Sequence, residues 1–282
     1  MAHYCSINGK ITAQEKASLG VMDLAVLRGY GIFDYFLFKY GRPLLEEQYL
    51  ERFYNSAQKM GLEPTLNRQE LSRHLRELIA ANGEDKGAIR LVLTGGYAPD
   101  GYTPGDPNLI VLQHAYPNYP ESYFTEGVGL ISHPFQREWP EVKTINYLTG
   151  IKLLPEIRRA GALEVLYHYN GELREAVRSN VFLVTEKEEL VTPDRDILFG
   201  ITRDSIFKAA EGLLPVAARK VSMEEVYSAR EVFLTGSNKS AMPVVRIDGR
   251  PVGDGKVGYW SKKLKEALEA YREGYYERVL KI

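Results

Sequence analysis

The sequence has little cysteine and no excess of charge. Cys5 is its single cysteine, so an internal disulfide is excluded, and no cluster of cysteine and histidine has the spacing of a zinc site. We therefore predict no bound metal. Lysine and arginine total 36 against 37 aspartates and glutamates, so the charge balance does not point to nucleic acid or a membrane surface as a partner. Any anion-binding site must be a local one.

Long apolar runs are also missing. No stretch approaches the length needed to span a bilayer. The first five residues, Met-Ala-His-Tyr-Cys, do not form the basic and then apolar pattern of a secretory signal. Together with the low cysteine content, these absences predict a protein of the reducing cytoplasm.

The length of 282 residues is sufficient for two domains. Residues 117–121, Pro-Asn-Tyr-Pro-Glu, contain two prolines and no apolar periodicity, which is typical of a linker. We predict an N-terminal domain over residues 1–117, a linker over 118–122 and a C-terminal domain over 123–282.

Helices and strands are both expected in quantity. Apolar residues recur at helical spacing over 45–61, and Asn67 and Gly83 have the positions of caps on a helix over 68–81. Asn8-Gly9 predicts a hairpin over 3–12. Further strands are expected over 88–94 and 108–113, and further helices over 149–159 and 258–280, so the fold class is α+β.

Lys143 is the first candidate for chemistry. It follows the extended segment Pro-Glu-Val and precedes the β-branched Thr144 and Ile145, so an exposed helix face is not expected there. A neutral lysine amine attacks a carbonyl and forms a Schiff base. Most lysines are solvated surface groups, and the case for Lys143 depends on other segments.

Three of those segments suit a monophosphate. Ile201 and Thr202 follow Gly200 at a helix start, where free N–H groups attract an anion. Gly236 and Ser237 lie in a turn of small residues after a strand. Arg52 can supply charge, although an arginine on a helix usually forms a surface ion pair. None of these features is specific alone.

A reactive lysine with a phosphate site suggests pyridoxal 5′-phosphate, whose ring withdraws electrons from the substrate. The ring nitrogen must then face a carboxylate. Glu175 is the candidate, and a solvated turn glutamate is the alternative. Tyr147 can donate a hydrogen bond to the phenolate oxygen of the cofactor, or it can be a core tyrosine.

Four motifs in order carry a resemblance to a known family. Lys143-Thr-Ile-Asn-Tyr147-Leu, Glu175-x-x-x-Ser179-Asn180-x-Phe182, Leu198-Phe-Gly-Ile-Thr-Arg203 and Thr235-Gly-Ser resemble the class IV pyridoxal-phosphate aminotransferases. The likeness extends from about residue 5 to residue 270. It implies fold type IV, with a small N-terminal α/β domain, a larger C-terminal pseudo-barrel α/β domain and a homodimer.

The resemblance also implies roles for individual residues. Lys143 is the Schiff-base lysine and proton carrier, Glu175 lies at the pyridine nitrogen, and Tyr147 lies at O3′. The other implied cofactor contacts are Arg52, Ser179, Asn180, Ile201, Thr202, Gly236 and Ser237. One departure is visible, because the family often has histidine at the position of Tyr49.

The substrates are expected to be an amino acid and a 2-oxo acid. D-amino-acid transaminases usually carry an Arg-x-His pair in the loop that corresponds to residues 97–104, and this chain has none there. The segments around Arg28, Tyr30 and Arg90 resemble a less usual branch of these enzymes. In that branch arginines replace the pair, with Arg28 contributed across the dimer interface. Arg178 is the third arginine, and each of the three could instead form a structural ion pair.

This resemblance predicts a D-amino-acid transaminase that acts on D-alanine or D-glutamate with pyruvate or 2-oxoglutarate. A branched-chain L-amino-acid aminotransferase and an aminodeoxychorismate lyase are the alternatives within the family. A cofactor-binding protein without enzymatic activity is the alternative outside it.

Overall fold

The computed structural model describes residues 3–281, which divide into two compact units. The first unit contains the described parts of Met1–Pro117, Val142–Asn146 and Tyr275–Ile282, and the second contains Asn118–Glu141 and Tyr147–Gly274. The limits expected from the sequence place both Val142–Asn146 and the residues from Tyr275 onward in the C-terminal domain instead. Backbone pairing accounts for the placement of Val142–Asn146, because Phe33 N–H donates to Lys143 O over 2.8 Å and Ile145 N–H donates to Gly31 O over 3.1 Å.

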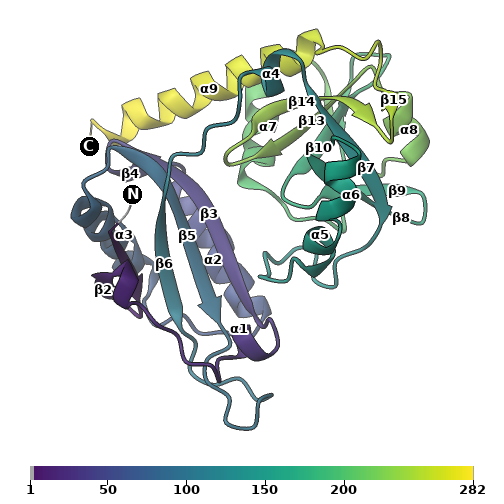
Figure 1. Ribbon diagram of the computed structural model, residues 1–282. Helices are drawn as coiled ribbons and strands as arrows, with labels where there is room; N and C mark the ends of the chain where they lie inside the picture. Colours follow the sequence, from purple (N-terminus) through teal and green to yellow (C-terminus); the bar gives the residue numbers. More distant parts are fainter. Residues whose placement is uncertain (1–2, 282) are drawn as a thin grey trace. The chain divides into compact units, whose positions relative to one another are not determined.

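The first unit is built on an antiparallel six-stranded sheet with the order β2-β1-β6-β5-β3-β4 (Figure 1). Its strands are β1 (Tyr4–Ile7), β2 (Lys10–Ala13), β3 (Gly31–Lys39), β4 (Arg42–Pro43), β5 (Lys86–Thr94) and β6 (Leu109–Ala115). Its helices are α1 (Leu24–Leu27), α2 (Glu46–Lys59) and α3 (Arg68–Asn82).

Local signals in the sequence fix several of these elements. Asn8 and Gly9 have positive φ angles of 50° and 79° in the β1–β2 turn, which confirms the predicted hairpin. Asn67 caps α3 and forms a capping box with Glu70, and Gly83 ends the helix at φ 68°. The predicted helix over 68–81 is therefore confirmed.

Side chains of β3 alternate between the two faces of this sheet. Phe36 packs on Tyr49 of α2, with 5.1 Å between the ring centroids, and Asp34 also reaches α2. Phe33 and Tyr35 project from the other face, where Arg90 of β5 lies beside both rings. The face opposite α2 thus carries an arginine framed by aromatic rings.

The second unit contains a nine-stranded mixed sheet. The order β12-β11-β10-β13-β14-β7-β8-β9 is joined by β15, which pairs with β14. The strands are β7 (Val128–Pro134), β8 (Glu164–Tyr169), β9 (Glu172–Ala176), β10 (Asn180–Val184), β11 (Leu190–Thr192), β12 (Val216–Ala218), β13 (Glu231–Gly236), β14 (Ser240–Ile247) and β15 (Arg250–Pro251). The helices that begin in this unit are α4 (Ser122–Thr125), α5 (Leu148–Lys152), α6 (Leu154–Arg159), α7 (Ile201–Ala210), α8 (Met223–Tyr227) and α9 (Tyr259–Val279).

The single helix expected over 149–159 is wrong, because the structure has α5 and α6 with a break at Leu153. Pro155 explains the break. Proline has no backbone N–H, and its ring conflicts with the carbonyl four residues earlier, here that of Ile151. The second helix accommodates Pro155 in its first turn.

Strands β10 and β13 bring two predicted motifs together. Phe182 and Phe233 pair across the strands, and their rings stack at 5.4 Å within the core. This register places Asn180 opposite Thr235. The start of β10 and the end of β13, where the Ser179-Asn180 and Thr235-Gly-Ser motifs lie, therefore meet at one end of the sheet.

The helices between residues 3 and 281 include none that is both long enough and apolar enough to cross a membrane. The longest, α9, has charged residues along its length.

Candidate active site

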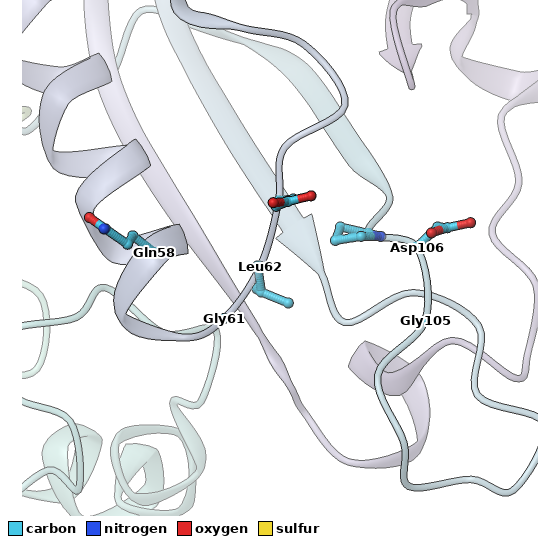
Figure 2. A pocket seen from close by; sticks show the side chains of 7 residues that line it. Gln58, Gly61, Leu62, Gly105 and Asp106 are labelled. Atoms are coloured by element: carbon cyan, nitrogen blue, oxygen red, sulfur yellow. The ribbon is translucent and has the colours of Figure 1, made fainter.

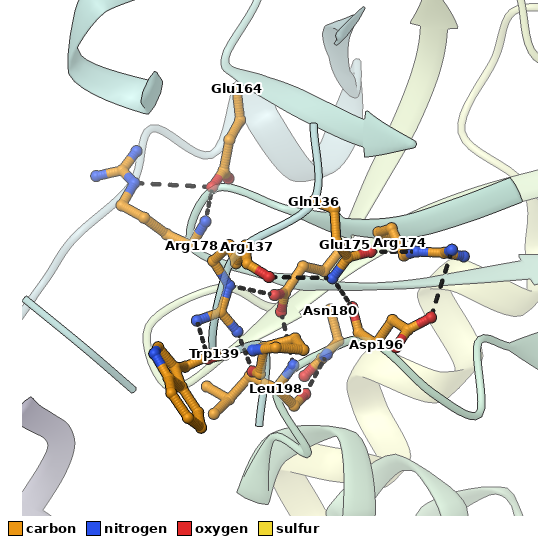
Figure 3. Close-up of polar contacts among 11 residues, drawn as sticks. Gln136, Arg137, Trp139, Glu164, Arg174, Glu175, Arg178, Asn180, Asp196 and Leu198 are labelled. Atoms are coloured by element: carbon orange, nitrogen blue, oxygen red, sulfur yellow. Dashed lines mark hydrogen bonds and ion pairs between the residues drawn. The ribbon is translucent and has the colours of Figure 1, made fainter. Parts of the chain in front are cut away.

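Glu175 lies at the centre of a polar network in the second unit. Its Oε1 accepts a hydrogen bond from Arg137 Nε over 2.7 Å, and its Oε2 accepts one from the backbone N–H of Leu198 over 3.1 Å (Figure 3). Only 9% of the glutamate side chain is exposed. These two contacts fix the direction of the carboxylate.

Arg137 is a residue that the sequence did not single out. It donates to the backbone oxygen of Trp139 over 3.3 Å and also contacts that of Pro140. The loop before Lys143 and the β9 carboxylate are thereby joined through one guanidinium. The sequence signal for Arg137 was only its position six residues before Lys143. That position does not indicate that Arg137 pairs with Glu175, which lies far away in the sequence.

Tyr147 is the residue that precedes α5. Burial raises the pKa of its phenol, Arg137 opposes that shift, and Glu175 adds to it. The hydroxyl therefore stays protonated at neutral pH and can donate a hydrogen bond. This is the property that the predicted contact with a phenolate oxygen requires.

The start of α7 has no side-chain cap, because its N-cap residue is Gly200. Helix starts without caps present backbone N–H groups to an anion. A Cβ atom at position 200 would lie 2.1 Å from Asn180 Oδ1, so any other residue there would force the asparagine or the helix start to move. Asn180 Nδ2 in turn donates to Leu198 O over 2.7 Å and so holds the loop before α7. Thr202, in the first turn, is buried.

The turn after β13 supplies further polar groups. Within residues 3–281, the buried Oγ1 of Thr235 has no hydrogen-bond partner. Arg272 of α9 donates to Ser237 O over 3.4 Å and to Ser240 Oγ over 3.0 Å, and these contacts link the turn to α9. An unpaired buried hydroxyl is costly in a folded protein. Thr235 is thus a further ligand candidate, next to the predicted Gly236 and Ser237.

Arg52 belongs to the first unit and forms a two-point ion pair. Its Nη2 lies 2.6 Å from Asp34 Oδ1 and its Nε lies 3.0 Å from Oδ2. The guanidinium also lies 5.3 Å from the ring centroid of Tyr49, the residue at the position where the family often has histidine. Asp34 and Tyr49 together orient Arg52.

Lys143 is held as an extension of the β3 edge. Thr144 forms an isolated bridge with Ile32, and the Lys143 carbonyl accepts the N–H of Phe33. The Lys143 Nζ atom lies 4.7 Å from the centroid of the Phe33 ring. The residue is half-buried, and its amine lies over an aromatic face.

The predicted substrate arginines of the first unit differ in setting. Arg90 lies 5.4 Å from the Phe33 ring and 5.5 Å from the Tyr35 ring, and its buried Nε has no hydrogen-bond partner among the described residues. Arg28 is exposed and donates to the adjacent Leu27 O over 3.2 Å. Tyr30 donates its hydroxyl proton to Met60 O, so this contact already engages it.

Arg178 and Ser179 meet one carboxylate in the second unit. The backbone N–H of Arg178 donates to Glu164 (Figure 3). The hydroxyl of Ser179 donates to the same carboxylate. The guanidinium of Arg178 lies farther away, with 3.8 Å between its Nε and Glu164 Oε1, and the side chain is 56% exposed. Glu164 was not predicted as part of the site.

A pocket of about 390 Å³ lies elsewhere in the first unit, beside the end of α2 (Figure 2). Its lining includes the carboxylates of Glu63 and Asp106 together with Gln58 and Leu62. None of the predicted site residues lines it. Two carboxylates without a cation in the lining are unsuited to a phosphate or a substrate carboxylate.

The structure therefore gathers the predicted residues into two groups. Lys143, Arg52, Arg90, Arg28 and Tyr30 belong to the first unit. The residues of the second unit are Tyr147, Glu175, Arg178, Ser179, Asn180, Ile201, Thr202, Gly236 and Ser237.

Comparison with known proteins gives one consistent result. A family model described as amino-transferase class IV matches residues 31–247. A putative branched-chain-amino-acid aminotransferase from Methanocaldococcus jannaschii is 30% identical over 278 residues, which cover 94% of this chain and 95% of that protein. A D-alanine aminotransferase from Staphylococcus epidermidis is 28% identical over 277 residues, which cover 95% of this chain and 98% of the relative.

A solved structure agrees with these sequence relatives. The branched-chain amino acid aminotransferase from Escherichia coli superposes with a TM-score of 0.87 at 27% identity. The match covers 98% of this chain and 96% of that one.

Proposed function

Because the chain belongs to the class IV aminotransferases, we propose that it transfers an amino group between a D-amino acid and a 2-oxo acid. The fold class predicted from the sequence, α+β of fold type IV, is confirmed. The predicted cofactor, pyridoxal 5′-phosphate, is the one that this family uses. When bound, it supplies an aldehyde that condenses with an amine and a ring that withdraws electrons from the substrate α-carbon.

The residues of the second unit fit this cofactor. The uncapped start of α7 and the unpaired Thr235 hydroxyl suit a phosphate, which accepts several hydrogen bonds. Glu175 is a buried carboxylate whose direction is fixed, as a protonated ring nitrogen requires. In our proposal Ile201, Thr202, Gly236 and Ser237 hold the phosphate, with Ser179 and Asn180 beside them.

Each residue then has a separate task. Lys143 supplies the amine that would hold the cofactor. When the substrate takes its place, the free Lys143 amine would move a proton to or from the substrate α-carbon. Tyr147 donates a hydrogen bond at O3′, because its raised pKa keeps the proton on its oxygen. Arg52 contributes charge at the phosphate, and Asp34 sets the direction of that charge.

The observation that carries the substrate proposal is the setting of Arg90. The Phe33 ring contacts both the Lys143 amine and the Arg90 guanidinium, and Arg90 Nε is buried without a partner among the described residues. A carboxylate is the ligand that such a guanidinium binds most strongly. We propose that Arg90 binds a carboxylate of the amino acid or 2-oxo acid, with Arg28 and Arg178 as further contacts and Tyr30 supporting the loop beside Arg28.

D-specificity is supported by the three arginines, by the resemblance of the segments around Arg28 and Arg90 to the branch in which arginines replace the Arg-x-His pair, and by the similarity to D-alanine aminotransferases. Branched-chain L-amino-acid transamination is the second candidate. It is supported by a relative that is 30% identical over nearly its whole length and by the solved structure that matches at a TM-score of 0.87.

Paired enantiomers separate these candidates. The holoenzyme is mixed with D- and L-alanine, D- and L-glutamate, or L-leucine and L-valine, each with 2-oxoglutarate or pyruvate as appropriate. We expect the absorption of the bound cofactor to change with the D-amino acids and the matching oxo acid to appear. A response limited to L-leucine and L-valine would support the second candidate, and no response to any donor would overturn both.

Reductive trapping tests the lysine independently. Treatment of the holoenzyme with borohydride followed by peptide mapping should find the cofactor on Lys143. A label on Lys239, a buried lysine of the second unit, would contradict the assignment.

The resemblance also leads us to propose a cytoplasmic homodimer, with Arg28 contributed across its interface. Light scattering should then give twice the mass of one chain. Mixing inactive Lys143→Ala and Arg28→Ala variants should restore part of the activity through heterodimers, because one of the two sites would contain both native residues.

A further inference from the structure

A buried ion pair joins a strand and a turn of the second unit. Lys239 Nζ lies 3.2 Å from Glu164 Oε2, and the two side chains are only 1% and 2% exposed. Lys239 follows β13 in the turn that contains Gly236 and Ser237, and its N–H donates to Gly236 O over 3.1 Å. The pair therefore connects β8 to the turn that we assign to the phosphate.

The same carboxylate also faces Arg178. Glu164 accepts the backbone N–H of Arg178, while the Ser179 hydroxyl donates to Oε2 over 3.1 Å. The distance of 3.8 Å from the Arg178 guanidinium to Oε1 is too long for a hydrogen bond. One carboxylate thus has two cations near it, and only the buried one is in close contact.

A buried carboxylate needs a counter-ion, since an unpaired buried charge is strongly unfavourable. Lys239 provides it without reaching the surface. Burial lowers the pKa of the Lys239 amine, and Glu164 counteracts that shift, so each charge supports the other. With Lys239 as the close partner of Glu164, the guanidinium of Arg178 stays at the longer distance of 3.8 Å, and its side chain is 56% exposed.

We propose that Lys239 is a positioning residue for substrate binding: it neutralises Glu164 and so keeps Arg178 available for a substrate carboxylate. This inference rests on the substrate role of Arg178 in the proposed function. Without Lys239, Glu164 would have Arg178 as its nearest remaining cation, and Arg178 would close the 3.8 Å gap and withdraw from the substrate.

Lys239→Met in the holoenzyme tests the proposal. The methionine keeps an unbranched side chain and removes the charge. We expect KM for the amino acid to rise about tenfold or more while kcat stays within about threefold, because a contact common to ground state and transition state is lost. An unchanged KM would overturn the proposal.

The double variant Glu164→Gln/Lys239→Met separates positioning from simple damage to the fold. Its neutral amide has no charge to attract Arg178, so KM should return to within about threefold of the wild-type value. A KM as high as in Lys239→Met would overturn the proposal. If Lys239→Met does not fold, the double variant still decides, since any large rise in its KM also contradicts the mechanism.

Two controls distinguish this inference from the proposed function. Lys220→Met removes an ion pair with Glu172 whose lysine is 56% exposed, and it should leave KM unchanged. In an Arg178→Ala background, Lys239→Met should add nothing further to KM. If Arg178→Ala itself has no effect on KM, the substrate role of Arg178 fails. A crystal structure of Lys239→Met then tests the counter-ion step alone, which predicts that the distance from Arg178 Nε to Glu164 shortens to about 3 Å.

Discussion

Arg137 and Glu175 form an ion pair of 2.7 Å whose side chains are 18% and 9% exposed. The arginine comes from the loop before Lys143 and the glutamate from β9. A pair buried to this extent has a defined geometry, and removal of either partner leaves a charge without compensation. The orientation of the carboxylate that we assign to the ring nitrogen therefore depends on a residue outside the aminotransferase motifs.

Arg137→Ala should impair both stability and turnover. We expect a loss of about 3 kcal/mol in the free energy of unfolding, because Glu175 is left buried without its cation. The rate should fall about 10- to 100-fold as the carboxylate loses its fixed direction. Urea unfolding and steady-state kinetics measure the two effects. Arg195→Ala is the control, since its pair with Asp194 is exposed, and an equal loss there would contradict the prediction.

Asp34→Asn should weaken cofactor binding indirectly, through Arg52. The carboxylate receives two charge-assisted contacts from Arg52, and an amide can neither match their strength nor accept both in the same way. We expect about tenfold weaker binding of pyridoxal 5′-phosphate, measured by absorption titration of the apoenzyme. Glu77→Gln, which breaks the exposed pair with Arg73, should leave the affinity at the wild-type value.

Pattern in the sequence predicted the elements that depend on local chemistry. Asn67 with Glu70, Asn8-Gly9 and the apolar spacing of α2 each act within a few residues, so their structures follow from short-range rules. The break at Leu153 also has a local cause, because Pro155 acts only on the helix that contains it, but the prediction of a single helix there missed it.

Contacts between distant segments could not be predicted in this way. The pairs of Arg137 with Glu175 and of Lys239 with Glu164 depend on the order of strands in a nine-stranded sheet, which no local spacing encodes. The placement of Lys143 along the β3 edge likewise depends on a long-range backbone bridge. The motifs therefore indicate candidates for reactive residues, whereas they do not identify the residues that orient those candidates.

Gly200→Ala should disturb the start of α7. The new Cβ would lie 2.1 Å from Asn180 Oδ1, so either the asparagine or the helix must move. We expect a loss of about 1–3 kcal/mol in unfolding free energy and weaker binding of inorganic phosphate or the cofactor. Asn180→Ala removes the clashing oxygen, so the double variant should lose less stability than the sum of the two single variants. Strict additivity in thermal and urea unfolding would show that the two residues do not conflict.

His114 should contribute to sensitivity to acid. Burial, followed by the nearby charge of Arg90 on β5, lowers the pKa of this histidine below its ordinary value of 6.5, and the ring of Tyr35 on β3 lies 6.3 Å away. The unfolded chain therefore takes up a proton in a pH range where folded His114 does not. The stabilising contribution of neutral His114 is therefore fully present above pH 6.5. It declines as the pH falls from there toward the lower pKa of the folded state.

His114→Phe should reduce the slope of the unfolding free energy against pH, by at most the slope that corresponds to the uptake of one proton. Urea unfolding of the wild type and the variant between about pH 7.5 and about pH 5 measures the slope. His168, whose pKa burial also lowers, provides an internal comparison. His168→Phe should also reduce the slope of the unfolding free energy against pH. In the double variant the two reductions should add, because the residues lie in different units. A variant at position 114 whose stability falls with acid as steeply as that of the wild type would contradict the assignment.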